Sequence, residues 1–172
     1  MQRIVGSVLI LTATIGAGYM YGEELKQYLQ RMLYLRYVIE LIRGELTYTG
    51  APIPELLYDV ARRIREPYKR WLKSVAREAQ ERDETAFVRI WNRCVDRYLK
   101  ELRLKTEHSI LLKELGTFLG QGDRETLDRS VQLYLNRMDL EIEKLREGLA
   151  SRKKIANCLG VMGGLFLVVL LL

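Results

Sequence analysis

All charged residues but Arg3 are confined to the middle of this chain. The sequence has 172 residues, of which 28 are Lys or Arg and 22 are Asp or Glu, yet none of these lies at residues 4–22 or 155–172. Only Arg3 precedes the first uncharged segment. A helix of about 18 residues is roughly 27 Å long, which is close to the thickness of the hydrocarbon core of a bilayer. The sequence therefore predicts transmembrane helices at residues 4–22 and 155–172, which flank a water-exposed domain at residues 23–154.

The first apolar segment has a second interpretation as a signal peptide, because Met1, Gln2 and Arg3 form a short positively charged region before it. The segment is longer than the apolar region of a usual signal peptide. In addition, bulky Tyr19 and Met20 follow the small residues that could form a cleavage site. We therefore favour an uncleaved first span, and we expect the second segment, at the end of the sequence, to be an anchor as well.

Basic residues next to the two predicted spans favour a cytoplasmic middle domain, because short segments rich in Lys and Arg stay on the cytoplasmic side. These residues are Lys26, Arg31, Arg36, Lys144, Arg146, Arg152, Lys153 and Lys154. Arg3 and the amino terminus are positive charges on the other side of the first span, and they favour the opposite orientation. We therefore expect residues 23–154 in the cytoplasm and both termini on the other side of a cell membrane.

The middle domain is predicted to be all-α, as a bundle of six helices. Its apolar residues recur at steps of three and four positions, and no long stretch alternates between apolar and polar residues. Helix breaks are indicated at residues 49–54, at Glu66–Pro67, at the polar residues 81–85 and at residues 120–123, and the fourth helix is expected to continue to Leu102. Six amphipathic helices joined by short loops can enclose one core.

A glycine-rich segment after the fifth helix predicts the turn of a helix hairpin. Gly116 interrupts the apolar pattern, Gly120 or Gly122 can supply a left-handed C-cap, and Asp123 can cap the next helix. No predicted strand precedes this segment and no Gly-Lys-Ser/Thr follows it, so it is not a nucleotide-binding P-loop.

No pattern of residues indicates catalysis, a metal or a cofactor. His108 is the single histidine, and we expect it to be a solvated helix residue without metal-binding partners. Cys94 lies on an apolar helix stripe and Cys158 in the second predicted span, so both are interpreted as ordinary buried thiols. Acidic and basic residues alternate, which is typical of solvated helix faces. We therefore expect a protein that is not an enzyme and has no small-molecule substrate.

The strongest concentration of charge lies between Arg62 and Arg77, which makes this segment the predicted docking surface for a partner. It contains Arg62, Arg63, Arg65, Lys69, Arg70, Lys73 and Arg77, with Glu66 as its single acid. An acidic protein, anionic lipid or nucleic acid could bind such a surface. Anchors at both ends would keep the domain near the membrane, which favours protein or lipid over nucleic acid. A solvated face without a partner is the remaining alternative.

The two predicted spans each contain a Gly-x-x-x-Gly pattern, which lets helices approach closely in lipid. The glycines are Gly18 and Gly22 in the first span and Gly160 and Gly164 in the second. We expect the spans to pack against each other or against a neighbouring chain through them.

Four features of the sequence together resemble the stage III sporulation protein AB family of endospore-forming bacteria, which is distantly similar to the F-type platform domain of type II secretion and type IV pilus systems. These features are the terminal apolar segments, the helix break at residues 45–55, the turn at residues 119–124 and the closing apolar tail. In F-type domains a glycine-containing turn joins the last two helices, and Gly116, Gly120, Gly122 and Asp123 occupy matching places.

The resemblance implies a structural part of the channel complex between mother cell and forespore, located in the mother-cell membrane that faces the forespore. The implied partners are a secretion-type ATPase and neighbouring channel subunits, and the implied role is one required for spore formation. Secretion platform proteins repeat their helical domain, whereas this chain has one, so homo-oligomerisation would supply further copies. A membrane-tethered module that binds nucleic acid or anionic lipid is the alternative function.

The apolar pattern of the fourth helix also gives a stability prediction. Trp91 is expected to be a buried anchor, so Trp91→Ala should lower the free energy of unfolding by about 3 to 5 kcal/mol. This is a large part of the net stability of a small domain. Thermal and urea unfolding of the two proteins measure the difference, and an unchanged melting temperature would remove Trp91 from the core.

Overall fold

The computed structural model describes the backbone of residues 2–80, 87–120 and 124–171. It describes the side chains of residues 23–80, 87–120, 125–151 and 155. Contacts divide the chain into two units, residues 31–140 and residues 1–30 with 141–172.

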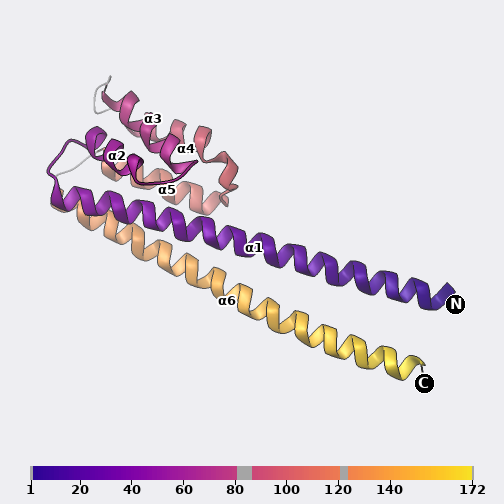
Figure 1. Ribbon diagram of the computed structural model, residues 1–172. Coiled ribbons are helices and arrows are strands. Elements are labelled where there is room, and N and C mark those ends of the chain that lie inside the picture. Colours follow the sequence, from indigo (N-terminus) through magenta and orange to yellow (C-terminus); the bar gives the residue numbers. More distant parts are fainter. Residues whose placement is uncertain (1, 81–86, 121–123, 172) are drawn as a thin grey trace. The chain divides into compact units, whose positions relative to one another are not determined.

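All regular elements in the described backbone are helical, which confirms the predicted all-α class (Figure 1). In chain order they are α1 (Gln2–Tyr48), α2 (Ile53–Arg62), α3 (Tyr68–Gln80), α4 (Phe87–Tyr98), the 3₁₀ helix η2 (Lys100–Leu102), α5 (Thr106–Leu119) and α6 (Arg124–Leu171). α1 and α6 belong partly to each unit, and α2 to α5 lie in the unit of residues 31–140.

Glycine and proline set the helix boundaries between α1 and α3. Gly50 adopts a left-handed conformation with φ of 64° after the end of α1, and Pro52 occupies the position before α2. Both conformations are typical of helix ends, because glycine tolerates positive φ and proline favours the first turn. The cis peptide bond between Glu66 and Pro67 precedes α3. The predicted breaks at these places are therefore confirmed.

The predicted fourth helix is too long. α4 ends at Tyr98, and the 3₁₀ helix Lys100–Leu102 follows it. Arg103 closes this turn with φ of 48°, and its backbone N–H donates to the carbonyl of Lys100. Leu99 and Leu102 are still buried, so the apolar pattern continues although the helix does not. The predicted turn at residues 81–85 lies outside the described residues.

The core of the unit formed by residues 31–140 is centred on two tryptophans. Trp71 of α3 and Trp91 of α4 are fully buried, and their rings meet edge to face with centroids 4.8 Å apart. The Trp91 Nε1 donates a hydrogen bond of 2.8 Å to the carbonyl of Leu112 in α5. α3 packs against both α2 and α4, and α4 packs against α5. The predicted burial of Trp91 is therefore confirmed.

Gly116 has a role that differs from the predicted one. It lies inside α5, where a Cβ atom would overlap the indole of Trp91. Gly120 is the C-cap of α5, but its φ of −87° is right-handed, so the left-handed cap predicted for Gly120 is wrong. The carbonyl of Gly116 accepts the N–H of Gly120, which closes the last turn without a positive φ. Gly122 and Asp123 lie outside the described residues.

Two arginine–aspartate pairs connect α1 to α6 within residues 31–140. Arg36 binds both carboxylate oxygens of Asp139, with Nη2 to Oδ2 at 3.0 Å, and Arg43 Nε lies 2.8 Å from Asp128 Oδ1. The hydrogen bond from Arg43 holds the pKa of Asp128 below its usual value. All four side chains are partly exposed, so each pair adds little stability and mainly fixes the register of the helices.

Among the residues whose side chains are described, no helix carries an apolar stretch of the length needed to cross a membrane. The predicted spans at residues 4–22 and 155–172 fall outside these residues, apart from Ile155. The four span glycines, Gly18, Gly22, Gly160 and Gly164, fall outside them as well. The membrane spans and their glycine packing stay predictions.

The contact between Gly116 and Trp91 gives a second stability prediction. Gly116→Ala should lower the free energy of unfolding by about 1 to 3 kcal/mol, because a methyl group there forces the buried indole to move. Alanine is normally favoured over glycine inside a helix by about 1 kcal/mol. Urea unfolding measures the change.

Gly148→Ala is the matched control, because a Cβ atom at Gly148 in α6 meets nothing within 4 Å. This control should leave the stability unchanged or raise it. A Gly116→Ala protein as stable as the control would contradict the described packing.

Candidate interaction surface

The basic segment between Arg62 and Arg77 covers the end of α2, the link to α3 and most of α3 itself. The two helices pack together through their apolar faces, which bury Leu57 and Val60 of α2 and Leu72 and Val75 of α3. Because the apolar residues occupy the buried faces, the basic residues are left on the outer faces. Each of the seven is exposed or half-exposed, so they lie at the surface of the described domain, and the docking of a partner there stays a prediction.

Four of the seven cations have partners within the chain. Arg63 Nη1 lies 2.7 Å from Glu45 Oε1 of α1, and Arg70 pairs with Glu66 one turn before it. Arg65 stacks over the ring of Tyr34 with its guanidinium 4.1 Å from the ring centroid, and the Nζ of Lys73 lies 5.8 Å from the centroid of Tyr58. The contacts of Arg63 and Arg65 connect the segment to α1, and the contact of Lys73 connects α3 to α2. These four cations therefore already interact with groups of the domain itself.

Arg62, Lys69 and Arg77 have no ion-pair partner in the described part of the chain. Lys69, Lys73 and Arg77 follow each other at intervals of four residues, which places them along one face of α3. We call Arg62, Lys69, Lys73 and Arg77 the cationic surface. Such a surface can bind a carboxylate or phosphate group, but it contains no nucleophile or general base, so its chemistry is binding.

His108 and Cys94 are of residue types that are common in active sites, but both are buried. His108 is 3 % exposed, so the expectation of a solvated histidine is wrong. It lies at the buried face of α5, one turn before Leu112. Cys94 is also buried, and burial together with the neighbouring Glu78 raises the pKa of its thiol to about 11. A thiol with this pKa is protonated at neutral pH and is a poor nucleophile.

The described side chains contain no group of three or more His, Cys, Asp or Glu residues that could hold a metal ion. Cys158 lies outside the described residues.

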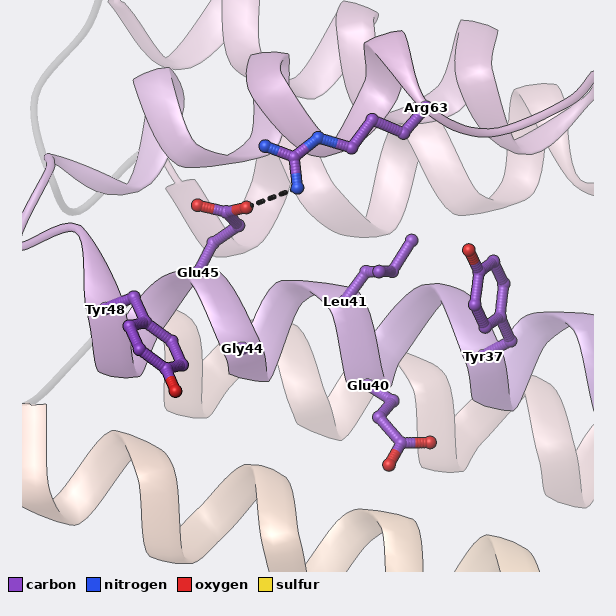
Figure 2. A pocket seen from close by; sticks show the side chains of 7 residues that line it. All are labelled: Tyr37, Glu40, Leu41, Gly44, Glu45, Tyr48 and Arg63. Carbon is purple, nitrogen blue, oxygen red and sulfur yellow. Dashed lines mark ion pairs between the residues drawn. The ribbon is translucent and has the colours of Figure 1, made fainter.

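A shallow pocket of about 390 Å³ lies on α1, on a surface that the sequence reasoning did not identify (Figure 2). Its lining residues are Tyr37, Glu40, Leu41, Gly44, Glu45, Tyr48 and Arg63. Figure 2 shows the Arg63–Glu45 ion pair at its edge. The signal for it was present in the sequence, because Tyr37, Leu41, Gly44 and Tyr48 recur at steps of four, three and four.

Comparisons with known proteins find a matching family, a similar sequence and a similar fold. The family model described as stage III sporulation protein AB covers residues 3–172. Stage III sporulation protein AB of Bacillus subtilis (strain 168) is 22 % identical over 172 residues, which is 100 % of both chains. A solved structure of a stage III sporulation protein AB aligns with a TM-score of 0.63 at 17 % identity, over 72 % of this chain and 97 % of that one. The helical fold is therefore one already seen in a solved structure. Because the family model spans nearly the whole sequence, the chain belongs to the stage III sporulation protein AB family.

Proposed function

We propose that this chain is a membrane platform of the sporulation complex, without enzymatic activity of its own. In this proposal residues 4–22 and 155–172 span the mother-cell membrane that faces the forespore, and residues 23–154 lie in the cytoplasm. The helical domain binds a secretion-type ATPase and neighbouring channel subunits. Membership of the sporulation family supports the cellular role, and the uncharged ends of the sequence support the anchors.

The observation that carries the proposal is the cationic surface. Many charged side chains of the described domain belong to ion pairs, such as Arg63 with Glu45 and Lys113 with Asp96. Arg62, Lys69 and Arg77, on two adjoining helices, have no ion-pair partner among the side chains that the structure describes. Complementary charge on a partner would steer its approach and fix its orientation. An acidic surface of the ATPase is the expected counterpart.

The same surface could bind anionic lipid or nucleic acid, which is the alternative function. Contacts with phosphate groups would make either interaction strongly dependent on salt. Sedimentation with anionic vesicles and retention on DNA at increasing salt distinguish these ligands from a protein partner. The protein partner is favoured because Tyr58, 48 % exposed beside Lys73, adds an aromatic contact of the kind common at protein interfaces.

Charge reversal on the cationic surface tests the proposal. The full-length chain carrying Arg62→Glu, Lys69→Glu and Arg77→Glu should capture the cognate ATPase at least about tenfold less well than the unchanged chain. Three lost charge contacts of about 0.5 kcal/mol each, with repulsion added, give this magnitude. Pull-down from detergent at fixed ionic strength measures the captured ATPase.

The matched control reverses three exposed cations on α4 and η2, through Arg89→Glu, Arg97→Glu and Lys100→Glu. It changes the net charge by the same amount at another place and should keep full capture. Equal capture by both variants would reject the cationic surface as the docking site.

A further inference from the structure

The pocket on α1 has the arrangement of residues that receives a side chain from a neighbouring helix. Its α1 residues form two overlapping sets, each spaced i, i+3, i+4 and i+7: Tyr37, Glu40, Leu41 and Gly44, then Leu41, Gly44, Glu45 and Tyr48. Four residues at this spacing surround the hole into which a knob inserts when helices pack side by side. Gly44 belongs to both sets and lies between Leu41 and Glu45 on α1 (Figure 2). A Cβ atom there would meet nothing within 4 Å. The pocket therefore fits a helix.

The outer face of α6 offers side chains that could act as such knobs. Leu133 and Leu140 are 52 % and 65 % exposed, and they lie seven residues apart, which places them on the same face of the helix. The opposite face of α6 is buried through Val131 and Met138. Exposed arginines stand one turn to either side of Leu133, at Arg129 and Arg137. Leu133, with an arginine one turn to either side, is therefore complementary in charge to a pocket that has Glu40 at its edge.

The pairs Arg36–Asp139 and Arg43–Asp128 fix how far along α1 each residue of α6 lies. Along α1, Ile39 and Glu40 lie midway between the two arginines. Along α6, Leu133 and Tyr134 lie midway between the two aspartates. Leu133 is therefore level with the first hole on α1 of its own chain. The buried faces of both helices contribute to the same core, so their exposed faces open away from it.

We propose that a second copy of this chain covers the pocket, through a two-fold axis that runs along α1 and α6. A rotation of 180° about such an axis keeps every residue at its level and places α6 of one copy on α1 of the other. Leu133 of each copy then enters the hole formed by Tyr37, Glu40, Leu41 and Gly44 of the other. The four helices form an antiparallel bundle, which is a stable packing arrangement.

The signs of the charges suit this occupant. Glu40, whose side chain is 54 % exposed and pairs with Arg36, stands at the edge of the hole. The arrangement brings it between Arg129 and Arg137 of the other copy, which would add to or replace the pairs of these arginines with Glu125 and Glu114 of their own chain. The contact occurs twice, because each copy offers both the hole and the knob, so the assembly closes as a dimer and leaves no open end. The direction of the axis rests on the proposed function. If both copies are anchored in the same membrane, an axis along the helices lets the predicted spans of both copies enter that membrane from the same side.

Filling the hole tests the inference. Gly44→Leu places a side chain in the pocket at a position where a Cβ atom meets nothing within 4 Å, and leucine is favoured over glycine in a helix. The full-length Gly44→Leu chain in detergent should therefore melt no lower than the unchanged chain, while its dimer dissociates at least about tenfold more readily. Leu133→Glu should dissociate the dimer as well, because it removes the knob. Light scattering over a range of concentrations measures the mass.

Gly148→Leu is the matched control, because a Cβ atom at Gly148 also meets nothing within 4 Å and Gly148 is not one of the residues that line the pocket. This control should keep the dimer of the unchanged chain. A monomeric unchanged chain, or a Gly44→Leu chain as dimeric as the control, would overturn the inference.

Cysteine crosslinking in membranes tests the pairing of the helices. In a Cys158→Ser background, Leu41→Cys chains mixed with Leu133→Cys chains should form crosslinked dimers, and either chain alone should form few. Crosslinking by Leu41→Cys alone would mean that α1 meets α1, and no crosslinking in the mixture would mean that no such contact exists. Either result would overturn the inference.

The outcome is separable from the proposed function. Gly44→Leu leaves the cationic surface unchanged, so capture of the ATPase by this variant reports on the platform role independently of the dimer. Conversely, the chain with Arg62, Lys69 and Arg77 changed to Glu keeps both the hole and the knob, and it should remain dimeric.

Discussion

The indole of Trp91 joins three of the helices that build the domain, and the packing of α3, α4 and α5 depends on it. Its ring meets Trp71 of α3 edge to face, its Nε1 donates to the carbonyl of Leu112, and it rests against the backbone of α5 at Gly116. A glycine is required at this contact because any side chain would occupy the volume of the ring. The hydrogen bond satisfies the polar atom that burial of a tryptophan would otherwise leave without a partner. Packing on both sides of Trp91 thus holds α3, α4 and α5 as one layer.

The burial of apolar helix faces accounts for the position of both proposed interaction surfaces. α2 and α3 bury their apolar faces, which leaves the cationic surface on their outer side. α1 buries Leu35, Ile39 and Ile42, which turns Tyr37, Leu41 and Gly44 outward. The Arg63–Glu45 ion pair connects the edge of the pocket to the basic segment.

Most of the helical fold could be predicted from the sequence, because its determinants are local. Gly50, Pro52 and Pro67 mark helix boundaries through backbone preferences that do not depend on the rest of the fold. The apolar spacing around Trp91 likewise identified a buried face. Leu99 and Leu102 misled the prediction of α4, because the periodicity of buried residues does not reveal that the backbone tightens to a 3₁₀ turn.

Features that depend on tertiary contacts could not be predicted in the same way. Gly116 was assigned to a turn, since nothing in the sequence places the Trp91 ring against it. The burial of His108 was missed because a single polar residue on a helix is usually exposed. The basic segment was identified from composition, but which of its cations are used within the domain depended on the distant residues Tyr34 and Glu45.

The proposed function requires that both ends of the chain are embedded in one membrane and hold the helical domain on its cytoplasmic side. The most direct measurement is protease protection of an epitope inserted between Glu81 and Thr85, carried out on intact protoplasts and on inverted vesicles of sporulating cells. The account predicts that the epitope is protected in protoplasts and digested in inverted vesicles. Digestion in intact protoplasts, or recovery of the epitope in the soluble fraction, would contradict it.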